Sequence, residues 1–259
     1  MTLSLDARQR ALLQHMGIRL DFLPPVRETP APSASVATPT EPAAPGPVER
    51  IQVSHADWPT LQQAVSQCTA CSLCKTRKHT VFGAGTMPDA HAAGVDLMIV
   101  GEVPGEHEDK QGQPFVGAAG QLLDQMLSAL GLSRQAEGGP LGTVFMANVL
   151  RCRPPDNRNP SPAEMAQCGP FLQRQIELAR PKVLLAMGRF GAQALLSPQM
   201  PDVEGTPLGK LRLNSHQYQG TPVVVTFDPA YLLRNPAAKA QVWADLCLAH
   251  SMCPPAGGA

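Results

Sequence analysis

A repeated alternation of short apolar segments with amphipathic ones constrains the fold of this chain more than any other feature. The apolar segments, which predict buried strands, are 95–100, 143–147, 182–187 and 222–227. The amphipathic segments, which predict helices, are 118–130, 162–179 and 235–250. Ser161-Pro162-Ala163-Glu164 combines a capping box with proline at the first helical position. This order predicts an α/β fold with a mainly parallel sheet, helices on both faces and ligands at the carboxyl ends of the strands.

Proline divides the chain before this body begins. Many of the 27 prolines fall among alanine, serine and threonine in one stretch that cannot bury apolar surface. We therefore expect four parts: an N-terminal amphipathic helix over 1–23, a disordered linker over 24–50, the α/β domain over 51–253 and a disordered tail over 254–259.

The predicted N-terminal helix has two possible fates. A lone short helix is marginally stable in water, so it either frays or docks loosely. Alternatively, it is a peptide that lays its apolar face into a groove of a partner protein. The residues expected to make that contact are Arg10, Leu12, Leu13, Met16 and Ile18.

Charge and hydropathy limit the compartment and the partners. The first 20 residues hold no uninterrupted apolar block, and no segment reaches the roughly 20 apolar residues of a membrane span. We expect a cytoplasmic protein with a monomeric body. The 21 basic and 21 acidic residues cancel, which removes the simplest argument for a nucleic-acid binder but leaves room for a local basic patch.

Five of the seven cysteines form a pattern that suggests a metal centre. Cys68 and Cys71 make a C-x2-C pair, Cys74 follows three residues later, and Cys152 and Cys168 stand far downstream. In a reducing compartment such cysteines are more often metal ligands than disulfide partners. Their spacing suits zinc or an iron–sulfur cluster and does not choose between them.

Residues with chemical potential follow the predicted strands. Glu102 begins a glycine-rich loop after the first strand, Phe115 is an aromatic able to stack on a base, and Asn148 carries an amide able to read a base edge. Leu232 and Leu233 follow the last strand and suggest a wedge that opens base stacks. Each feature alone is weak, but all lie at carboxyl ends of parallel strands.

Together these residues resemble family 4 uracil-DNA glycosylases, the iron–sulfur branch of the uracil-DNA glycosylase superfamily, over roughly residues 68–246. The matching motifs are Cys68-Thr-Ala-Cys71, Val81-Phe82-Gly83-Ala84-Gly85, Gly101-Glu102-x-Pro104-Gly105, Gly112-Gln113-Pro114-Phe115-Val116-Gly117, Asn148-x-x-x-Cys152-Arg153-Pro154-Pro155 and Pro229-Ala230-Tyr231-Leu232-Leu233-Arg234. The resemblance implies a three-layer fold and a repair enzyme that flips uracil out of DNA and hydrolyses its N-glycosidic bond.

The resemblance also implies roles for individual residues. It assigns a structural [4Fe–4S] cluster to Cys68, Cys71, Cys152 and Cys168, and leaves Cys74 as an extra cysteine. It places Phe115 and Asn148 against the flipped base, with Val103 beside it, and Glu102 and Glu108 in the water-activating loop. It assigns DNA contact to Arg153, Leu232, Leu233 and Arg234.

Two positions depart from the family pattern and predict weakened or lost uracil excision. Asp228 stands where the family has a histidine that donates a hydrogen bond to the uracil oxygen. An ionised carboxylate cannot donate, and losing such a donor costs about 2.7–4 kcal/mol. Only a strongly raised pKa would keep Asp228 neutral. Val103 stands where the family has alanine or glycine, and its branched side chain is expected to crowd the attacking water.

The ends of the chain resemble a second family more faintly. Residues 8–18 and 233–243 look like the N- and C-terminal regions of the psi subunit of the DNA polymerase III clamp loader, which has a glycosylase-like fold without the chemistry. The resulting alternative is a non-catalytic subunit that binds its partner through residues 1–23. A third, less favoured alternative is an electron-transfer protein.

Three basic groups predict a small DNA footprint on a neutral protein. They are Lys75, Arg77 and Lys78 beside the first cysteines, Arg151, Arg153 and Arg158 around Cys152, and Arg234 after the wedge. Their small number implies modest, steeply salt-dependent DNA affinity.

Overall fold

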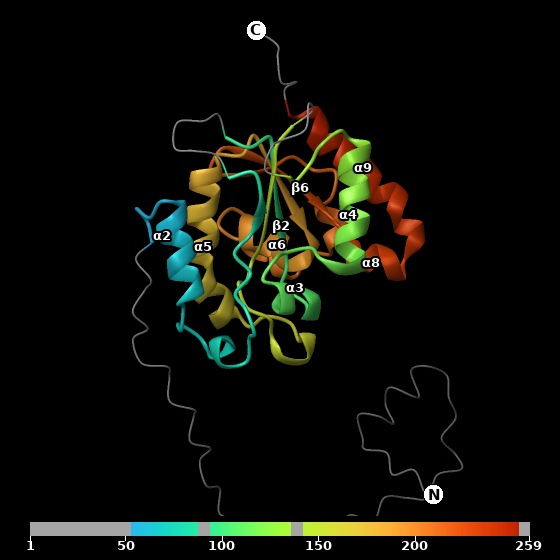
Figure 1. Ribbon diagram of the computed structural model, residues 1–259. Coiled ribbons are helices and arrows are strands. Elements are labelled where there is room, and N and C mark those ends of the chain that lie inside the picture. The colour runs from blue at the N-terminus through green and yellow to red at the C-terminus, as the bar shows by residue number, and fades with distance from the viewer. Residues whose placement is uncertain (1–52, 88–93, 136–141, 254–259) are drawn as a thin grey trace, which may run out of the picture. The chain divides into compact units, whose positions relative to one another are not determined.

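The apolar segments form the centre of a six-stranded sheet in the computed structural model (Figure 1). The strands are β1 (Ala84–Gly85), β2 (Leu97–Gly101), β3 (Val144–Asn148), β4 (Val183–Met187), β5 (His216–Tyr218) and β6 (Thr221–Thr226). Their order across the sheet is β1-β3-β2-β4-β6-β5. The four central strands are parallel, and the short edge strands β1 and β5 pair antiparallel to their neighbours. The predicted mainly parallel sheet is confirmed.

The structure describes residues 53–87, 94–135 and 142–253, all within the second of the chain's two units, Pro47–Ala259. The predicted N-terminal helix, the linker and the C-terminal tail lie outside these residues and stay predictions. No helix in the described ranges is long and apolar enough to cross a membrane.

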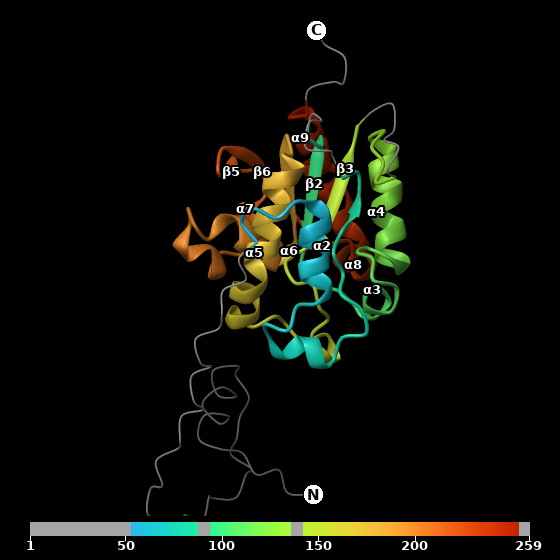
Figure 2. The same ribbon diagram turned by 60° about the vertical axis from the view of Figure 1, so that its left-hand side comes forward.

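Helices cover both faces of the sheet. They are α2 (Trp58–Ser66), α3 (Glu106–Gln111), α4 (Gly117–Ala129), α5 (Pro162–Ala179), α6 (Gly188–Leu196), α7 (Leu208–Leu211), α8 (Pro229–Arg234) and α9 (Lys239–Ser251). In Figure 1, α5 lies to one side of the sheet with α2 outside it, and α4, α8 and α9 lie to the other. Figure 2 shows β5 and α7, which both contact β6, at one edge of the sheet. The result is the three-layer architecture that the sequence predicts.

Alternation along the central strands divides the core between the two faces. Met98 and Val100 of β2 belong to the cluster that includes residues of α5 and α6, whereas Leu97 and Ile99 belong to the cluster that includes residues of α4, α8 and α9. All four side chains are buried to 1% exposure or less. Because helices cover both faces, a central strand needs apolar residues at every position, which explains the uninterrupted apolar runs in the sequence.

The predicted helices are confirmed, with one change near the C-terminus. Helix α5 has the expected capping box, in which the Glu164 N–H donates to Ser161 Oγ at 3.2 Å and the Ser161 N–H donates to Glu164 Oε2 at 2.8 Å. The helix predicted over 235–250 begins only at Lys239, after a 3₁₀ turn, η4 (Pro236–Ala238). Proline has no N–H and clashes with a preceding helical turn, so it separates α9 from α8. Helices α2, α3, α6, α7 and α8 and the two edge strands were not predicted.

Candidate active site

Two adjoining pockets open at the carboxyl ends of the parallel strands. The Asn148 pocket, of about 350 Å³, includes Phe115 and Asn148 in its lining, and the Tyr231 pocket, of about 570 Å³, includes Tyr231 and Arg234. The residues that line both pockets, and so form their shared border, include Glu102, Val103 and Asp228. The chain runs from β2 to β3 on one side and later returns to β4 on the other, so the pockets lie where α/β folds bind ligands.

Phe115 and Asn148 meet above Gly101, the last residue of β2. A Cβ added to Gly101 would lie 2.5 Å from both the Phe115 ring and Asn148 Oδ1. Asn148 is the direct neighbour of Gly101 in the sheet, and Phe115 reaches this position with a positive φ of 52°. Both side chains line the Asn148 pocket although they are nearly buried. An aromatic face and an amide therefore converge on one small space, as base recognition requires.

Glu102 is held at the amino end of α6. Its Oε1 accepts a hydrogen bond from the Phe190 N–H at 3.1 Å. A Cβ on Gly188, which has a φ of 83°, would lie 2.5 Å from the same oxygen. Burial raises the pKa of Glu102, and the hydrogen bond from Phe190 opposes this shift. The helix terminus thus stabilises a carboxylate in a site that would otherwise favour the neutral acid.

Glu108 ties two loops together. Its Oε2 accepts from the Gly105 N–H at 3.1 Å and its Oε1 accepts from the Val116 N–H at 3.0 Å. The glycine loop after β2 is thereby joined to the segment that carries Phe115. Both carboxylate oxygens already bind backbone donors, which suits positioning better than water activation.

Asp228 occupies the predicted catalytic position and also caps α8. Its Oδ1 accepts from the Ala230 N–H at 2.7 Å. Burial raises the pKa of Asp228 to about 6, and the charge of Glu102 adds to this rise, while the hydrogen bond from Ala230 opposes it. A substantial fraction of this carboxyl is therefore protonated in mildly acidic solution, and Oδ2 is then available as a donor.

The segment predicted to be a wedge loop is the short helix α8, and only part of it faces solvent. Leu232 is fully buried in the core against α4 and α9, so it cannot enter a base stack; that prediction is wrong. Leu233 is 46% exposed and Tyr231 is 37% exposed. The Tyr231 ring stacks on Phe227 with centroids 4.9 Å apart. A helix points successive side chains in different directions, so only one leucine of the pair is exposed.

A third pocket is lined by all five patterned cysteines, Cys68, Cys71, Cys74, Cys152 and Cys168. Arg77 Nη1 donates to Cys152 Sγ at 3.1 Å, and the Arg151 backbone N–H donates to Cys168 Sγ at 3.3 Å. Burial raises the pKa of the Cys168 thiol to about 12, so it stays protonated unless a metal displaces the proton. Among the described residues, no three His, Cys, Asp or Glu side chains converge closely enough to hold one metal ion.

The thiol-rich lining of this pocket suits a metal centre, either zinc or an iron–sulfur cluster. A structural zinc ion needs four ligands converging at about 2.3 Å from one point. In a [4Fe–4S] cluster each cysteine binds its own iron, so the four sulfurs surround a cage. Soft thiolate donors and N–H groups directed at the sulfurs are compatible with both alternatives.

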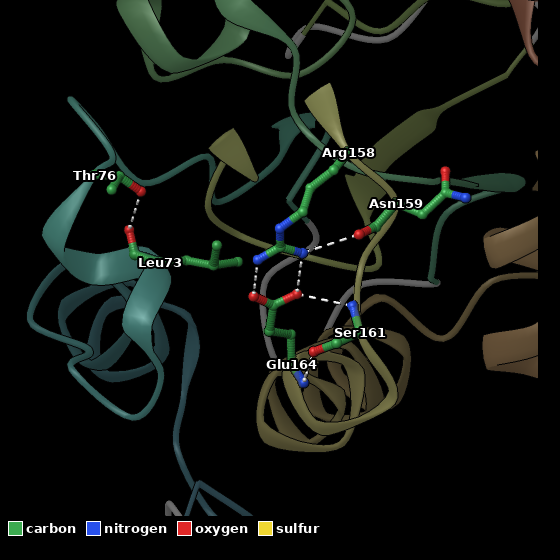
Figure 3. Close-up of polar contacts among 6 residues, drawn as sticks. All are labelled: Leu73, Thr76, Arg158, Asn159, Ser161 and Glu164. Atoms are coloured by element: carbon green, nitrogen blue, oxygen red, sulfur yellow. Dashed lines mark hydrogen bonds and ion pairs between the residues drawn. The ribbon is translucent and has the colours of Figure 1, made fainter. Parts of the chain in front are cut away.

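An ion pair between Arg158 and Glu164 bridges the segment between Cys152 and Cys168 (Figure 3). Arg158 Nη1 and Nη2 donate to the two carboxylate oxygens of Glu164 at 2.9 and 2.6 Å. Glu164 lies in the first turn of α5, which also carries Cys168, and Leu73 from the first cysteine segment extends toward the pair in Figure 3. Arg158 lowers the pKa of Glu164 to about 2, so the pair is ionised at neutral pH.

These contacts reduce the predicted basic footprint. Arg151 is 1% exposed and Arg158 is paired with Glu164, so neither offers a free charge to DNA. Arg153 remains near the surface, where its Nε donates to Asn157 Oδ1 at 2.9 Å. Arg234 is exposed at the end of α8. Burial and pairing therefore remove two of the three arginines around Cys152 from the predicted footprint.

Two residues of the site were missed by sequence reasoning. Gly188 lets the Glu102 carboxylate approach α6, and the available signal was a glycine directly after an apolar strand. Tyr231 stacks in the second pocket, and its signal was an aromatic within the Pro229–Arg234 motif in a chain with few aromatics.

Fold and site define an α/β protein with a base-sized pocket at its strand ends, and a model of the uracil DNA glycosylase superfamily matches residues 88–247. The chain belongs to this superfamily. It is 35% identical over 193 residues to the type-4 uracil-DNA glycosylase of Archaeoglobus fulgidus, covering 73% of this chain and 89% of that protein. It is also 38% identical over 198 residues to the type-4 enzyme of Pyrobaculum aerophilum, covering 74% and 92%. The type-4 enzyme of Thermotoga maritima is 39% identical over 178 residues, covering 68% and 82%.

The resemblance to family 4 is confirmed by these relatives. The resemblance of the ends to the psi subunit gains no support from them, and residues 8–18 lie outside the described residues.

Proposed function

We propose that this protein is a uracil-DNA glycosylase of DNA repair, which binds a flipped uracil in the Asn148 pocket and hydrolyses its N-glycosidic bond. The observation that carries the proposal is the convergence of Phe115 and Asn148 above Gly101, beside the carboxyl groups of Glu102 and Asp228. Similarity to type-4 uracil-DNA glycosylases over most of their length supports the same reaction.

Base recognition follows from the pocket's two walls. The Phe115 ring offers a stacking face, and the Asn148 amide offers a donor and an acceptor to the edge of the base. Val103 lies on the border of both pockets, where its branched side chain narrows the space beside the base. The pocket therefore favours a planar pyrimidine without extra bulk.

Glu102 is the candidate for activating water. Its carboxylate is fixed by the α6 terminus at the border of the pocket, and its raised pKa brings it closer to the operating pH of a general base. Glu108 keeps this loop in register with Phe115 and has a positioning role.

Asp228 sets the pH at which the enzyme works. As the glycosidic bond breaks, negative charge builds on the uracil oxygens, and a hydrogen-bond donor there stabilises the transition state. Neutral Asp228 donates through Oδ2, whereas ionised Asp228 repels the leaving base. Uracil excision is therefore weak at neutral pH and increases on acidification.

We further propose that Cys68, Cys71, Cys152 and Cys168 hold a [4Fe–4S] cluster. When bound, the cluster cross-links the first cysteine segment, the segment after β3 and helix α5. The exposed Leu233 and Arg234 and the half-buried Arg153 are the candidates for DNA contact, with Leu233 filling the space that the flipped base leaves.

The test is uracil release from single- and double-stranded oligonucleotides by the full-length protein at pH 5.5 and pH 7.5. We expect release by the wild type and a loss of about 10²–10⁴-fold in the single-turnover rate for Glu102→Gln. Glu177→Gln is the matched control, because Glu177 pairs with Arg174 on α5 away from both pockets. No release at either pH, with iron bound and the fold intact, would refute the proposal.

A further inference from the structure

Arg151 is the bulkiest of the fully buried side chains in the described part of the protein. Its Nη1 donates to the Phe82 carbonyl at 3.1 Å. Its Nε and Nη2 are also buried, and neither has a hydrogen-bond partner among the described residues. Two charged donors in the interior are thus left unpaired, although buried arginines normally find acceptors for all their N–H groups.

The surroundings indicate where the missing partner lies. No ion pair joins Arg151 to a carboxylate within the described ranges, and its side chain lines the pocket of the five cysteines. Arg151, whose guanidinium stays protonated in proteins, therefore lies in the wall of the cysteine pocket.

We propose that Arg151 is the buried counter-charge of the cysteine-bound cluster, with its two unpaired nitrogens, Nε and Nη2, donating to the cluster's sulfur atoms. The inference rests on the [4Fe–4S] cluster of the proposed function. Four thiolates outweigh the positive charge of the oxidised iron–sulfide core, so the assembled centre is an anion. Such an anion would balance the positive charge of Arg151. Its sulfur atoms would accept the hydrogen bonds for which Nε and Nη2 have no partner among the described residues. Hydrogen bonds and charges at this position are among the factors that set the potential of such a cluster.

A purely structural role for Arg151 predicts something different. Gln175 Nε2 donates to the same Phe82 carbonyl at 2.9 Å, and Gln175 is likewise fully buried. If Arg151 only supports this carbonyl, its loss has the same consequences as the loss of Gln175. Gln175 also has a buried atom without a partner among the described residues, Oε1. Gln175 is therefore the matched control.

The experiment compares the full-length wild type with Arg151→Met, Arg151→Lys and Gln175→Leu, all purified without oxygen. Iron and sulfide per chain, the midpoint potential by spectroelectrochemistry and the rate of bleaching near 400 nm in air are measured for each. Arg151→Met removes the positive charge, so we expect a lower potential, since reduction adds an electron to an already anionic centre. We also expect at least severalfold faster bleaching. Arg151→Lys should stay near the wild-type potential, and Gln175→Leu should keep both the potential and the bleaching rate while losing thermal stability.

Wild-type potential and bleaching in Arg151→Met, with stability reduced as in Gln175→Leu, would overturn the inference. If Arg151→Met does not fold, Arg151→Lys decides: it keeps the charge but loses the planar pair of donors, and wild-type bleaching in that variant overturns the inference. If the purified wild type contains no iron, both the proposed cluster and this inference are refuted. Uracil release is measured in a separate assay, so the proposed glycosylase reaction is tested independently of this inference.

Discussion

Replacing Asp228 by asparagine tests whether one proton controls uracil excision. With a pKa of about 6, Asp228 is protonated in about one tenth of molecules at pH 7 and about nine tenths at pH 5. If only the neutral form donates to the leaving uracil, the wild-type rate increases up to about tenfold between these two pH values. Asparagine keeps the oxygen that caps α8 and always carries donor hydrogens. We therefore expect Asp228→Asn to be about tenfold faster than the wild type at pH 7 and equal to it near pH 5.

The same substitution has a consequence for stability whose sign can be worked out. The pKa of Asp228 rises on folding, from 3.8 to about 6, so the folded state binds this proton more tightly than the unfolded state. The contribution to stability is complete below pH 4 and is lost as the pH rises through 6. A shift of this size corresponds to at most about 3 kcal/mol. Asp228→Asn should thus raise the free energy of unfolding at pH 7 and change it little at pH 4.

Single-turnover uracil release from pH 4.5 to 8.5 and urea unfolding at the two limits measure both effects. The ratio of wild-type to Asp228→Asn rates removes the intrinsic pH dependence of glycosidic cleavage. A ratio that does not change with pH, or an asparagine variant slower than the wild type at pH 7, would refute the reasoning.

Three further predictions concern the site and its supports. Leu232→Ala should cost about 2–5 kcal/mol in urea unfolding, whereas Leu233→Ala should leave stability unchanged and slow excision from duplex more than from single-stranded DNA; equal stability losses would contradict the assignment. Gly101→Ala places a methyl group against the two side chains of the base pocket, so excision should fall at least tenfold for a stability cost of about 1–3 kcal/mol, and unchanged excision would argue against the pocket. Arg158→Met removes the two hydrogen bonds to Glu164, so it should lower the free energy of unfolding by about 1 kcal/mol and speed cluster loss in air. Bleaching at the wild-type rate would show that this ion pair does not support the cysteine segment.

Local patterns in the sequence were sufficient to predict the central strands and the main helices of the α/β fold. The strands β2, β3, β4 and β6 appear as apolar runs because both faces of the sheet are covered, and α5 begins where its capping box predicts. Helix α3 was not predicted, because its six residues, Glu106–Gln111, are all polar or charged and carry no apolar stripe. A short helix with that composition depends on its tertiary anchors, here the Glu108 bonds to neighbouring loops.

The candidate site was only partly predictable for a similar reason. Sequence pattern and family resemblance together located Glu102, Phe115, Asn148 and Asp228 at strand ends, because the carboxyl ends of parallel strands share one edge of the sheet. They could not distinguish Leu232 from Leu233, since the helical rotation that buries one and exposes the other appears only when α8 packs on the core.

What the sequence by itself determined is the α/β frame, the pattern of cysteines and the identity of the residues at the strand ends. Only the tertiary structure decided what those residues do. It placed the Glu102 carboxylate on a helix terminus, raised the pKa of Asp228 by burial and left two donors of Arg151 unpaired beside the cysteines. The physical reason is that periodicity and capping are local properties of the chain, whereas desolvation and the pairing of charges depend on segments far apart in sequence.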